Sequence, residues 1–142
     1  MEEKIIKAGC FLINVKEKSV ALVYREKQKD YSFPKGHLEN NETIEQCAIR
    51  ETEEETKRCP LILNSFEPFV EKYISSMGEN CVCYMYYAID NGQSINSSTD
   101  THKTFFIPFD DVEKTLSYQS LKDMWNIVKS NIIKIAYSCS NK

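Results

Sequence analysis

The segment from Gly36 to Thr56, GHLENNETIEQCAIRETEEET, constrains this chain more than any other. Its apolar residues recur with the spacing of a helix, so the segment can be projected onto a helical wheel at about 100° per residue. One face of that wheel begins with apolar or small side chains and continues with carboxylates, where further apolar residues are expected. That face carries Ile44, Cys47, Ala48, Glu51, Glu54 and Glu55. Glu53 points the other way.

Three like charges on a face that meets the core are destabilising unless a positive charge neutralises them. A hard divalent cation, Mg²⁺ above all, binds carboxylate oxygens and would do so. The alternative is an ordinary solvated helix with scattered glutamates, but such a helix places its charges opposite the apolar face. We therefore expect a metal site on this helix.

Composition limits the classes of protein that this chain can belong to. Its 142 residues suffice for a single domain, 1–142, with one core. Eighteen basic against 21 acidic residues give a net charge of −3, which makes nucleic acid an unlikely partner and gives no attraction to anionic membranes. No apolar run approaches the ~18–20 residues of a membrane span. The six cysteines lack zinc-binding spacing, so we expect reduced thiols and a cytoplasmic protein.

Apolar periodicity predicts helices and strands around a mixed sheet, an α/β or α+β fold. Strands are expected at 7–15, 19–25, 61–66, 69–75, 81–89 and 104–108. Polar loops are expected at 28–32 and 91–101, and further helices at 109–116 and 118–137. The acidic helix should begin at Glu42 or Thr43 and run to about Lys57. Asn40 or Asn41 is available as its N-cap.

The acidic segment also follows a known motif. Gly36 is followed after five residues by Glu42, after seven more by Arg50-Glu51 and after two more by Glu54-Glu55. This spacing resembles the Nudix box, and the order of elements along nearly the whole chain is similar to that of the Nudix family. The resemblance implies a Nudix-type α/β/α sandwich with a central mixed β-sheet. Lys57 stands where the family usually has a glycine, which predicts an altered helix end.

The resemblance also implies an enzyme, a pyrophosphohydrolase that hydrolyses a diphosphate linkage by water attack on phosphorus. The metal ligands would be Glu51, Glu54, Glu55 and the Gly36 carbonyl. The expected cofactor is Mg²⁺, for which Mn²⁺ could substitute. Bound metal would neutralise charge on the phosphates and lower the pKa of a water.

The general base is less defined by the motif. Glu54 or Glu51 is expected to take the proton of the attacking water, with Asp100 in a polar loop as the alternative. Arg50 lies within reach of Glu42 and of the later glutamates, so it can pair with a glutamate and hold it in place. Glu42 and Arg50 are therefore expected to support the ligands rather than to react.

Positive and aromatic residues near the motif are candidate substrate contacts. Arg25 and Lys35 are best placed by sequence to meet phosphates, with Lys72 a further candidate. His37 follows the box glycine and could bond a phosphate. Tyr84 lies on the strongest predicted strand and could stack on a base. Core packing is the alternative for Tyr84, and a solvated loop position is the alternative for Lys35.

The run Pro34-Lys35-Gly36-His37 resembles the asymmetrical diadenosine tetraphosphate hydrolases. Similar runs occur in relatives that act on diphosphoinositol polyphosphates or on mRNA caps. The net acidity argues against RNA, and a highly phosphorylated inositol calls for a denser cationic cluster. We therefore expect a monomer that converts diadenosine tetraphosphate, a dinucleoside polyphosphate, to ATP and AMP. A nucleotide-binding module without turnover is the non-enzyme alternative, but such domains typically lose box glutamates that this chain keeps.

Overall fold

An eight-stranded mixed sheet forms the centre of the described structure. The computed structural model describes residues 4–95 and 102–140. Its strands are β1 (Ile5–Asn14), β2 (Ser19–Arg25), β3 (Asp30–Ser32), β4 (Lys35–His37), β5 (Arg58–Ile62), β6 (Phe69–Ile74), β7 (Asn80–Ser94) and β8 (His102–Pro108). Its helices are α1 (Ile44–Thr56), α2 (Phe109–Thr115) and α3 (Gln119–Ser140). The mixed α/β fold expected from the sequence is confirmed.

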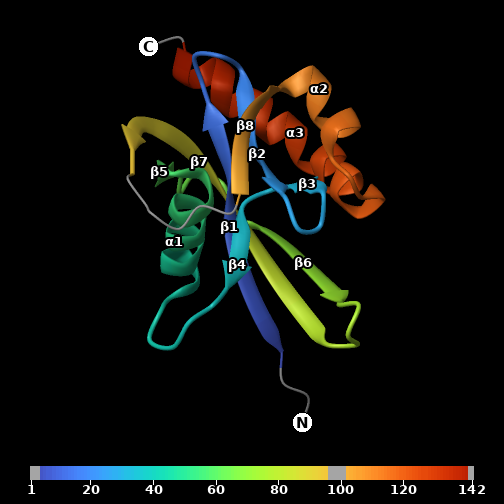
Figure 1. The fold of residues 1–142 in the computed structure, drawn as a ribbon. Coiled ribbons are helices and arrows are strands. Elements are labelled where there is room, and N and C mark those ends of the chain that lie inside the picture. The colour runs from blue at the N-terminus through green and yellow to red at the C-terminus, as the bar shows by residue number, and fades with distance from the viewer. Residues whose placement is uncertain (1–3, 96–101, 141–142) are drawn as a thin grey trace.

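Strand β1 organises the sheet because three other strands pair with it. It pairs in parallel with β7, from Ile5 opposite Cys81 to Ile13 opposite Ile89. It also pairs in antiparallel fashion with β2 around Ile13 and with β4 around Ala8. Strand β2 therefore leaves β1 where β4 joins it, and the sheet forks there (Figure 1). Strands β3 and β8 follow β2 on one branch of the fork.

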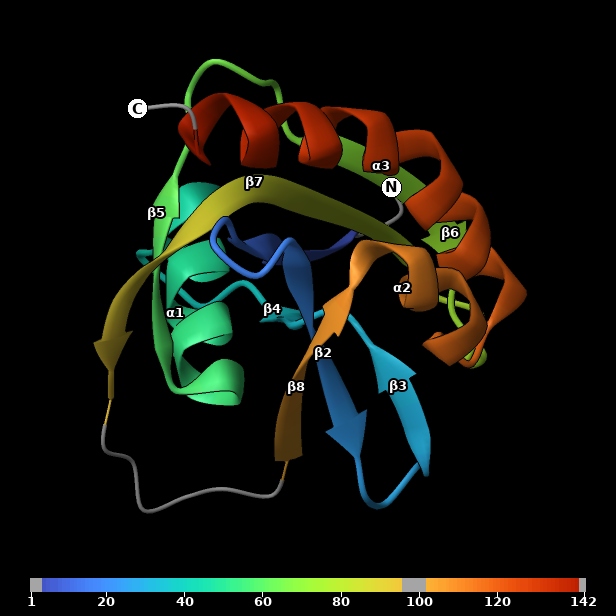
Figure 2. The same ribbon diagram turned by 90° about the horizontal axis from the view of Figure 1, so that it is seen from above.

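The helices cover opposite faces of the sheet, as in an α/β/α sandwich. Seen from above, α1 lies on one side of β1 and β7, and α3 lies on the other (Figure 2). Alternation along β1 supplies both faces, since Phe11 and Ile13 belong to the core cluster that includes α2 and α3 residues. Ala8, Cys10 and Leu12 belong to the cluster under α1. Small side chains dominate that second cluster, which lets α1 approach the sheet closely.

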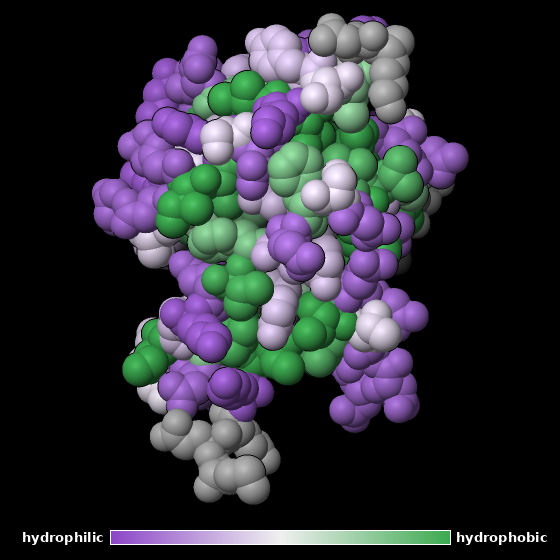
Figure 3. Space-filling model, turned by 180° about the vertical axis from the view of Figure 1, so that it is seen from behind, coloured by the Kyte–Doolittle hydropathy of each residue, from purple (hydrophilic) through white to green (hydrophobic). Residues whose placement is uncertain are grey.

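Not all apolar side chains are buried. Seen from behind, hydrophobic residues extend over the centre of the surface and hydrophilic residues border them (Figure 3). The exposed apolar side chains include Ile74 and Met77 at the β6–β7 hairpin and Ile127 on α3. Apolar atoms contribute roughly 55–60% of the accessible surface of folded proteins, so apolar residues on the surface need no partner to explain them.

Several predicted boundaries were wrong for physical reasons. Residues 30–32 form β3 rather than a loop, because they pair with β2, with Tyr31 opposite Tyr24. The sequence hid this strand because its buried side chains are the polar Asp30 and Ser32. Strand β5 begins at Arg58, directly after α1, and its register with β7 is irregular between Arg58 and Pro60. Proline is tolerated there because β5 lies at an edge of the sheet. Residues 91–94 continue β7 instead of forming a loop.

The N-cap of α1 is Thr43, so the expected caps Asn40 and Asn41 were wrong. The Gln46 amide donates to Thr43 Oγ1 at 3.0 Å, and the Thr43 amide donates to Gln46 Oε1 at 2.9 Å. This reciprocal pair is a capping box, which satisfies two amides that the helix itself leaves without partners. At the other end, the C-cap Lys57 adopts the left-handed conformation with φ 61°, which glycine adopts more readily than lysine.

The predicted row of three carboxylates on the core-facing side of α1 needs correction. The buried residues of this helix are Cys47, Ala48, Thr52 and Thr56. The core-facing side of α1 therefore continues through two threonines. The buried Thr56 hydroxyl has a hydrogen-bond partner, because Oγ1 donates to the Thr52 carbonyl at 2.6 Å. Glu54 is 59% exposed, so it does not lie on that side.

Two further expectations concern cysteines and membranes. All six cysteines are free, and three of them belong to the two core clusters. Of the helices formed by residues 4–95 and 102–140, none is both long and apolar enough to span a bilayer.

Candidate active site

Gly36 and Glu51 are in direct contact between β4 and α1. A Cβ atom at Gly36 would lie 2.0 Å from Glu51 Cδ, far inside van der Waals contact. Glycine is therefore required sterically, since only a backbone without a side chain leaves room for this carboxylate. The Gly36 carbonyl accepts a hydrogen bond from Cys47 Sγ at 3.6 Å, which fixes β4 against the helix.

Glu55 lies one turn further along α1 and is partly buried. Its Oε1 accepts a hydrogen bond from the Lys35 amide at 3.0 Å. Burial raises the pKa of Glu55 to about 7, against the opposing effect of that hydrogen bond. Burial also raises the pKa of Glu51, although Arg50 opposes this shift. Two partly desolvated carboxylates that repel each other are an environment that a cation would stabilise.

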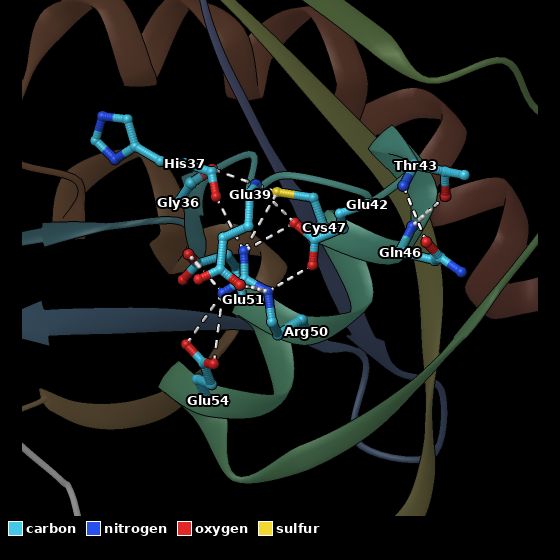
Figure 4. A network of polar contacts seen from close by, with 10 residues as sticks. All are labelled: Gly36, His37, Glu39, Glu42, Thr43, Gln46, Cys47, Arg50, Glu51 and Glu54. Carbon is cyan, nitrogen blue, oxygen red and sulfur yellow. Dashed lines mark hydrogen bonds and ion pairs between the residues drawn. The ribbon is translucent and has the colours of Figure 1, made fainter.

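Arg50 connects most of the charged groups around the box (Figure 4). It binds Glu42 through two hydrogen bonds of 2.6 and 3.0 Å, and this pairing lowers the pKa of Glu42 to about 2. The same guanidinium donates to Glu51 at 3.1 Å and to the His37 carbonyl at 2.9 Å. It lies 3.4 Å from Glu54. Arg50 thus pairs with glutamates, as its place in the sequence predicts, and its shortest bonds are to Glu42.

The box carboxylates do not converge on one point. In the part of the chain that the structure describes, no three His, Cys, Asp or Glu side chains are grouped closely enough to hold an ion. Arg50 stands between Glu51 and Glu54 instead. The donor types nevertheless fit a hard cation, because Glu51, Glu55 and the Gly36 carbonyl present oxygen atoms from two adjoining elements.

A cleft leads away from these carboxylates through the fork in the sheet. A pocket of 140 Å³ touches Glu55 and Gly36 and is lined by Lys7, Arg25 and Lys35. A larger pocket of 400 Å³ shares those three cations and continues to the far wall of the cleft. That wall includes Glu71, Tyr73, Tyr118 and Ser120. Carboxylates, cations and aromatic rings therefore follow one another along a continuous surface.

Of the predicted substrate contacts, Arg25, Lys35 and His37 line this cleft. Lys72 does not line it, because it is exposed and borders a separate pocket. Side chains alternate along β6, so Lys72 lies on the opposite face from Tyr73. Tyr84 packs against the core cluster beneath α1, which matches the core alternative considered for it. Asp100, the alternative base, lies outside the described residues.

Sequence reasoning missed Lys7, Tyr73 and Tyr118 as residues of the cleft. Lys7 pairs opposite His37, so its side chain is on the same face of the sheet. The Nζ atoms of Lys7 and Lys35 both lie 5.8 Å from the centre of the Tyr73 ring. The alternation of β1 could have indicated Lys7, but no local signal brings Tyr118 to the cleft across the fold.

Known proteins share the fold that carries this site. The family model of the NUDIX domain matches residues 4–128. An Ap4A hydrolase from C. elegans, solved as a binary complex, has a TM-score of 0.75 at 19% identity, covering 92% of this chain and 98% of that chain. A NUDIX family hydrolase from Clostridium perfringens has a TM-score of 0.69 at 17% identity, covering 84% and 92%. A search of curated protein sequences gave no significant match.

A third neighbour carries a metal. The bifunctional NMN adenylyltransferase/ADP ribose pyrophosphatase from Francisella tularensis, complexed with AMP and a Mn ion, has a TM-score of 0.70 at 17% identity. The alignment covers 93% of this chain and 43% of that longer chain. At these identities the likeness of the neighbours shows the fold alone.

The fold and the box together define a hydrolase of phosphoric anhydrides built on an α/β/α sandwich. Because the family model covers most of its length, this chain belongs to the Nudix family. The prediction of an enzyme, a pyrophosphohydrolase, is confirmed. Nudix hydrolases generally use divalent metals and act on small nucleotide substrates.

Proposed function

We propose that this protein hydrolyses a diphosphate linkage in a dinucleoside polyphosphate, converting diadenosine tetraphosphate to ATP and AMP with Mg²⁺. The observation that carries the proposal is the continuous cleft from Glu55, past three cations, to two tyrosines. A polyphosphate chain between two nucleosides has the matching order of chemical groups. Its phosphates would meet the cations, and a base would meet the aromatic wall.

Glu51, Glu54, Glu55 and the Gly36 carbonyl would hold the metal. The contact of Glu51 with Gly36 and the raised pKa of Glu55 support this assignment, because both groups are partly desolvated. Glu54 would have to turn from Arg50 toward the others, and its exposure leaves it room to do so. When bound, Mg²⁺ would neutralise negative charge on the phosphate oxygens. Mn²⁺ could substitute for Mg²⁺ in this role.

The chain's own groups bind and orient the polyphosphate. Arg25 offers a planar guanidinium that suits phosphate oxygens, while Lys7 and Lys35 contribute point charges. Glu54 or Glu51 would accept the proton of the attacking water, since phosphoryl transfer leaves mainly charge placement and water orientation to the protein. Arg50 would keep Glu51 in place, because its bonds to Glu42 and the His37 carbonyl fix the guanidinium that binds Glu51.

Two competing substrate classes are less well supported. A messenger RNA cap on a long RNA would need phosphate contacts beyond the cleft, and the net charge of −3 gives no general attraction to RNA. A diphosphoinositol polyphosphate carries phosphates around a compact ring, whereas this cleft places Glu71, Tyr73 and Tyr118 beyond its cations. The aromatic wall therefore favours a nucleoside. The free cysteines support a cytoplasmic enzyme, and we propose that it acts as a monomer.

A panel of candidate diphosphates with products resolved by chromatography tests the proposal. Wild-type protein with Mg²⁺ should release ATP and AMP from diadenosine tetraphosphate, and Glu54→Gln should lower turnover by about 10²-fold or more. Glu113→Gln, at an exposed position on α2, is the matched control and should leave turnover unchanged. Equal turnover in EDTA would exclude the metal-dependent reaction. Phosphate release from a diphosphoinositol polyphosphate, with no hydrolysis of dinucleotides, would show that the substrate is a diphosphoinositol polyphosphate.

A further inference from the structure

We infer that Asp30 is a positioning residue that holds Arg25 and Tyr118 at two walls of the cleft and thereby determines how tightly polyphosphate binds. This inference rests on the proposed function, because it concerns the phosphate-binding part of the same cleft. Asp30 belongs to β3, the strand that the polar sequence of residues 28–32 had suggested to be a loop. It does not line either pocket of the cleft itself.

Asp30 grips the Arg25 guanidinium with both carboxylate oxygens. Arg25 Nε donates to Asp30 Oδ1 at 2.7 Å, and Arg25 Nη2 donates to Asp30 Oδ2 at 2.7 Å. The two residues also stand opposite each other in the β2–β3 ladder, so the backbone sets the same spacing as the side chains. A bidentate pair of this kind fixes the plane of the guanidinium as well as its position.

The same carboxylate reaches the opposite side of the cleft. Tyr118 Oη donates to Asp30 Oδ2 at 2.6 Å, and the Tyr118 ring lines the larger pocket. Two bonds beside it join β3 to the connection between α2 and α3. The Tyr31 amide donates to Ser117 Oγ at 2.8 Å, and the Ser117 amide donates to the Tyr31 carbonyl at 3.4 Å. Asp30 thus lies at the junction of a cationic wall and an aromatic wall.

The burial of the pair indicates which group faces the substrate. The Asp30 side chain is 3% exposed, whereas that of Arg25 is 33% exposed and lines both pockets. The negative charge is therefore behind the guanidinium, where it orients the cation without facing phosphate. A guanidinium has five N–H donors, so those not directed at Asp30 remain for phosphate oxygens. A lysine at position 25 would keep the charge but lose the planar fork.

The first test is the steady-state kinetics of Asp30→Asn on diadenosine tetraphosphate with Mg²⁺. Loosening of Arg25 should raise KM by about tenfold or more while kcat falls much less, since misplacement of a binding group by about an ångström has effects of this size. Asp110→Asn, at an exposed position on α2, is the matched control and should change neither constant. An Asp30→Asn protein that folds and keeps the wild-type KM would overturn the inference.

A double-mutant cycle distinguishes positioning from a general structural role. If Asp30 acts through Arg25, Asp30→Asn should raise KM in the wild type but add little in an Arg25→Gln background. Equal increases in both backgrounds would show that Asp30 does not act through Arg25 and would overturn the inference. If Asp30→Asn does not fold, Arg25→Lys replaces it. This variant should also raise KM, and a wild-type KM for it would overturn the inference.

Binding of inorganic tripolyphosphate, measured by calorimetry with Mg²⁺ present, separates this inference from the proposed function. Wild-type protein should bind tripolyphosphate, and Asp30→Asn should weaken this binding by the same factor as KM. Wild-type protein that neither binds tripolyphosphate nor hydrolyses any dinucleotide would refute the proposed function, and the inference with it. If the wild type is active and Asp30→Asn binds tripolyphosphate as tightly as the wild type does, the inference is overturned but the proposed function stands.

Discussion

Adding one methyl group at Gly36 should abolish most activity while leaving the fold intact. The new Cβ of Gly36→Ala would lie 2.0 Å from Glu51 Cδ, and ordinary van der Waals contact begins at 3.4 Å. The Glu51 carboxylate must therefore recede by about 1.4 Å, because its partner is fixed backbone. A displacement of this size at a ligand of the reacting centre lowers the rate by about 10²-fold.

The cost in stability should be much smaller than the cost in activity. The atoms that clash with the new methyl group are the end of a flexible side chain, which can turn partly out of its rotamer at a cost of roughly 0.5–1.5 kcal/mol. Gly9→Ala is the contrasting variant, because its Cβ would lie 1.9 Å from the Pro34 carbonyl oxygen. A backbone atom cannot move away as a side chain can, so Gly9→Ala should separate β1 from β4 and lower the stability of the protein.

The assay measures kcat/KM and the thermal midpoint for both variants beside the wild type. Gly36→Ala should keep its midpoint within a few degrees, since about 1 kcal/mol moves the midpoint of a domain of this size by roughly 2–8 °C. Gly9→Ala should show a clearly lowered midpoint. Wild-type kcat/KM in Gly36→Ala would refute the reasoning, because it would mean that Glu51 does not need its present position.

Three further outcomes are expected. Burial raises the pKa of Glu55 from 4.5 to about 7, so between these pH values, in EDTA, the folded protein keeps a proton that the unfolded chain has lost. The free energy of unfolding in urea should therefore fall by up to about 3 kcal/mol as the pH rises from 4.5 to about 7. Glu55→Gln should remove this pH dependence. Thr43→Ala removes the capping box and should cost about 1 kcal/mol in urea unfolding without changing KM. Arg50→Lys keeps the charge but cannot bind Glu42 and the His37 carbonyl together, so kcat/KM should fall by at least about tenfold; an unchanged value would contradict a supporting role for this network.

Local patterns predicted most of the fold. Strand β2 was predicted with its observed bounds, Ser19–Arg25, because its short apolar run is bounded by polar residues on both sides. Strand β3 was missed because its buried residues are Asp30 and Ser32, whose polarity makes them look solvated. The burial of Asp30 depends on Arg25 and on the later turn at Tyr118, and no short window of sequence contains both partners.

The same distinction explains the errors at the site. The box fixes the spacing of Glu51, Glu54 and Glu55 along the chain, but it does not fix which of them faces the core. Thr52 occupies a buried position on the face of α1 where the sequence predicted carboxylates, because threonine is small enough to pack there. The prediction missed it because threonine is not counted among the apolar residues. Lys72 was assigned by charge, and only the pairing of β6 with β7 shows which face of the strand it occupies.

The position of the cleft follows from the way β1 divides its pairing. Strand β4 replaces β2 beside β1 at Ala8 and Gly9, and both residues are small where the box loop crosses them. Gly9 admits the Pro34 carbonyl, and Gly36 admits the Glu51 carboxylate, so the loop lies close to strand and helix at once. Since β2 has by then left β1, the branch that carries Arg25 faces the branch that carries Lys35 across the gap. The fork in the sheet therefore brings cations from separate strands to the carboxylates of α1, which a continuous flat sheet would keep apart.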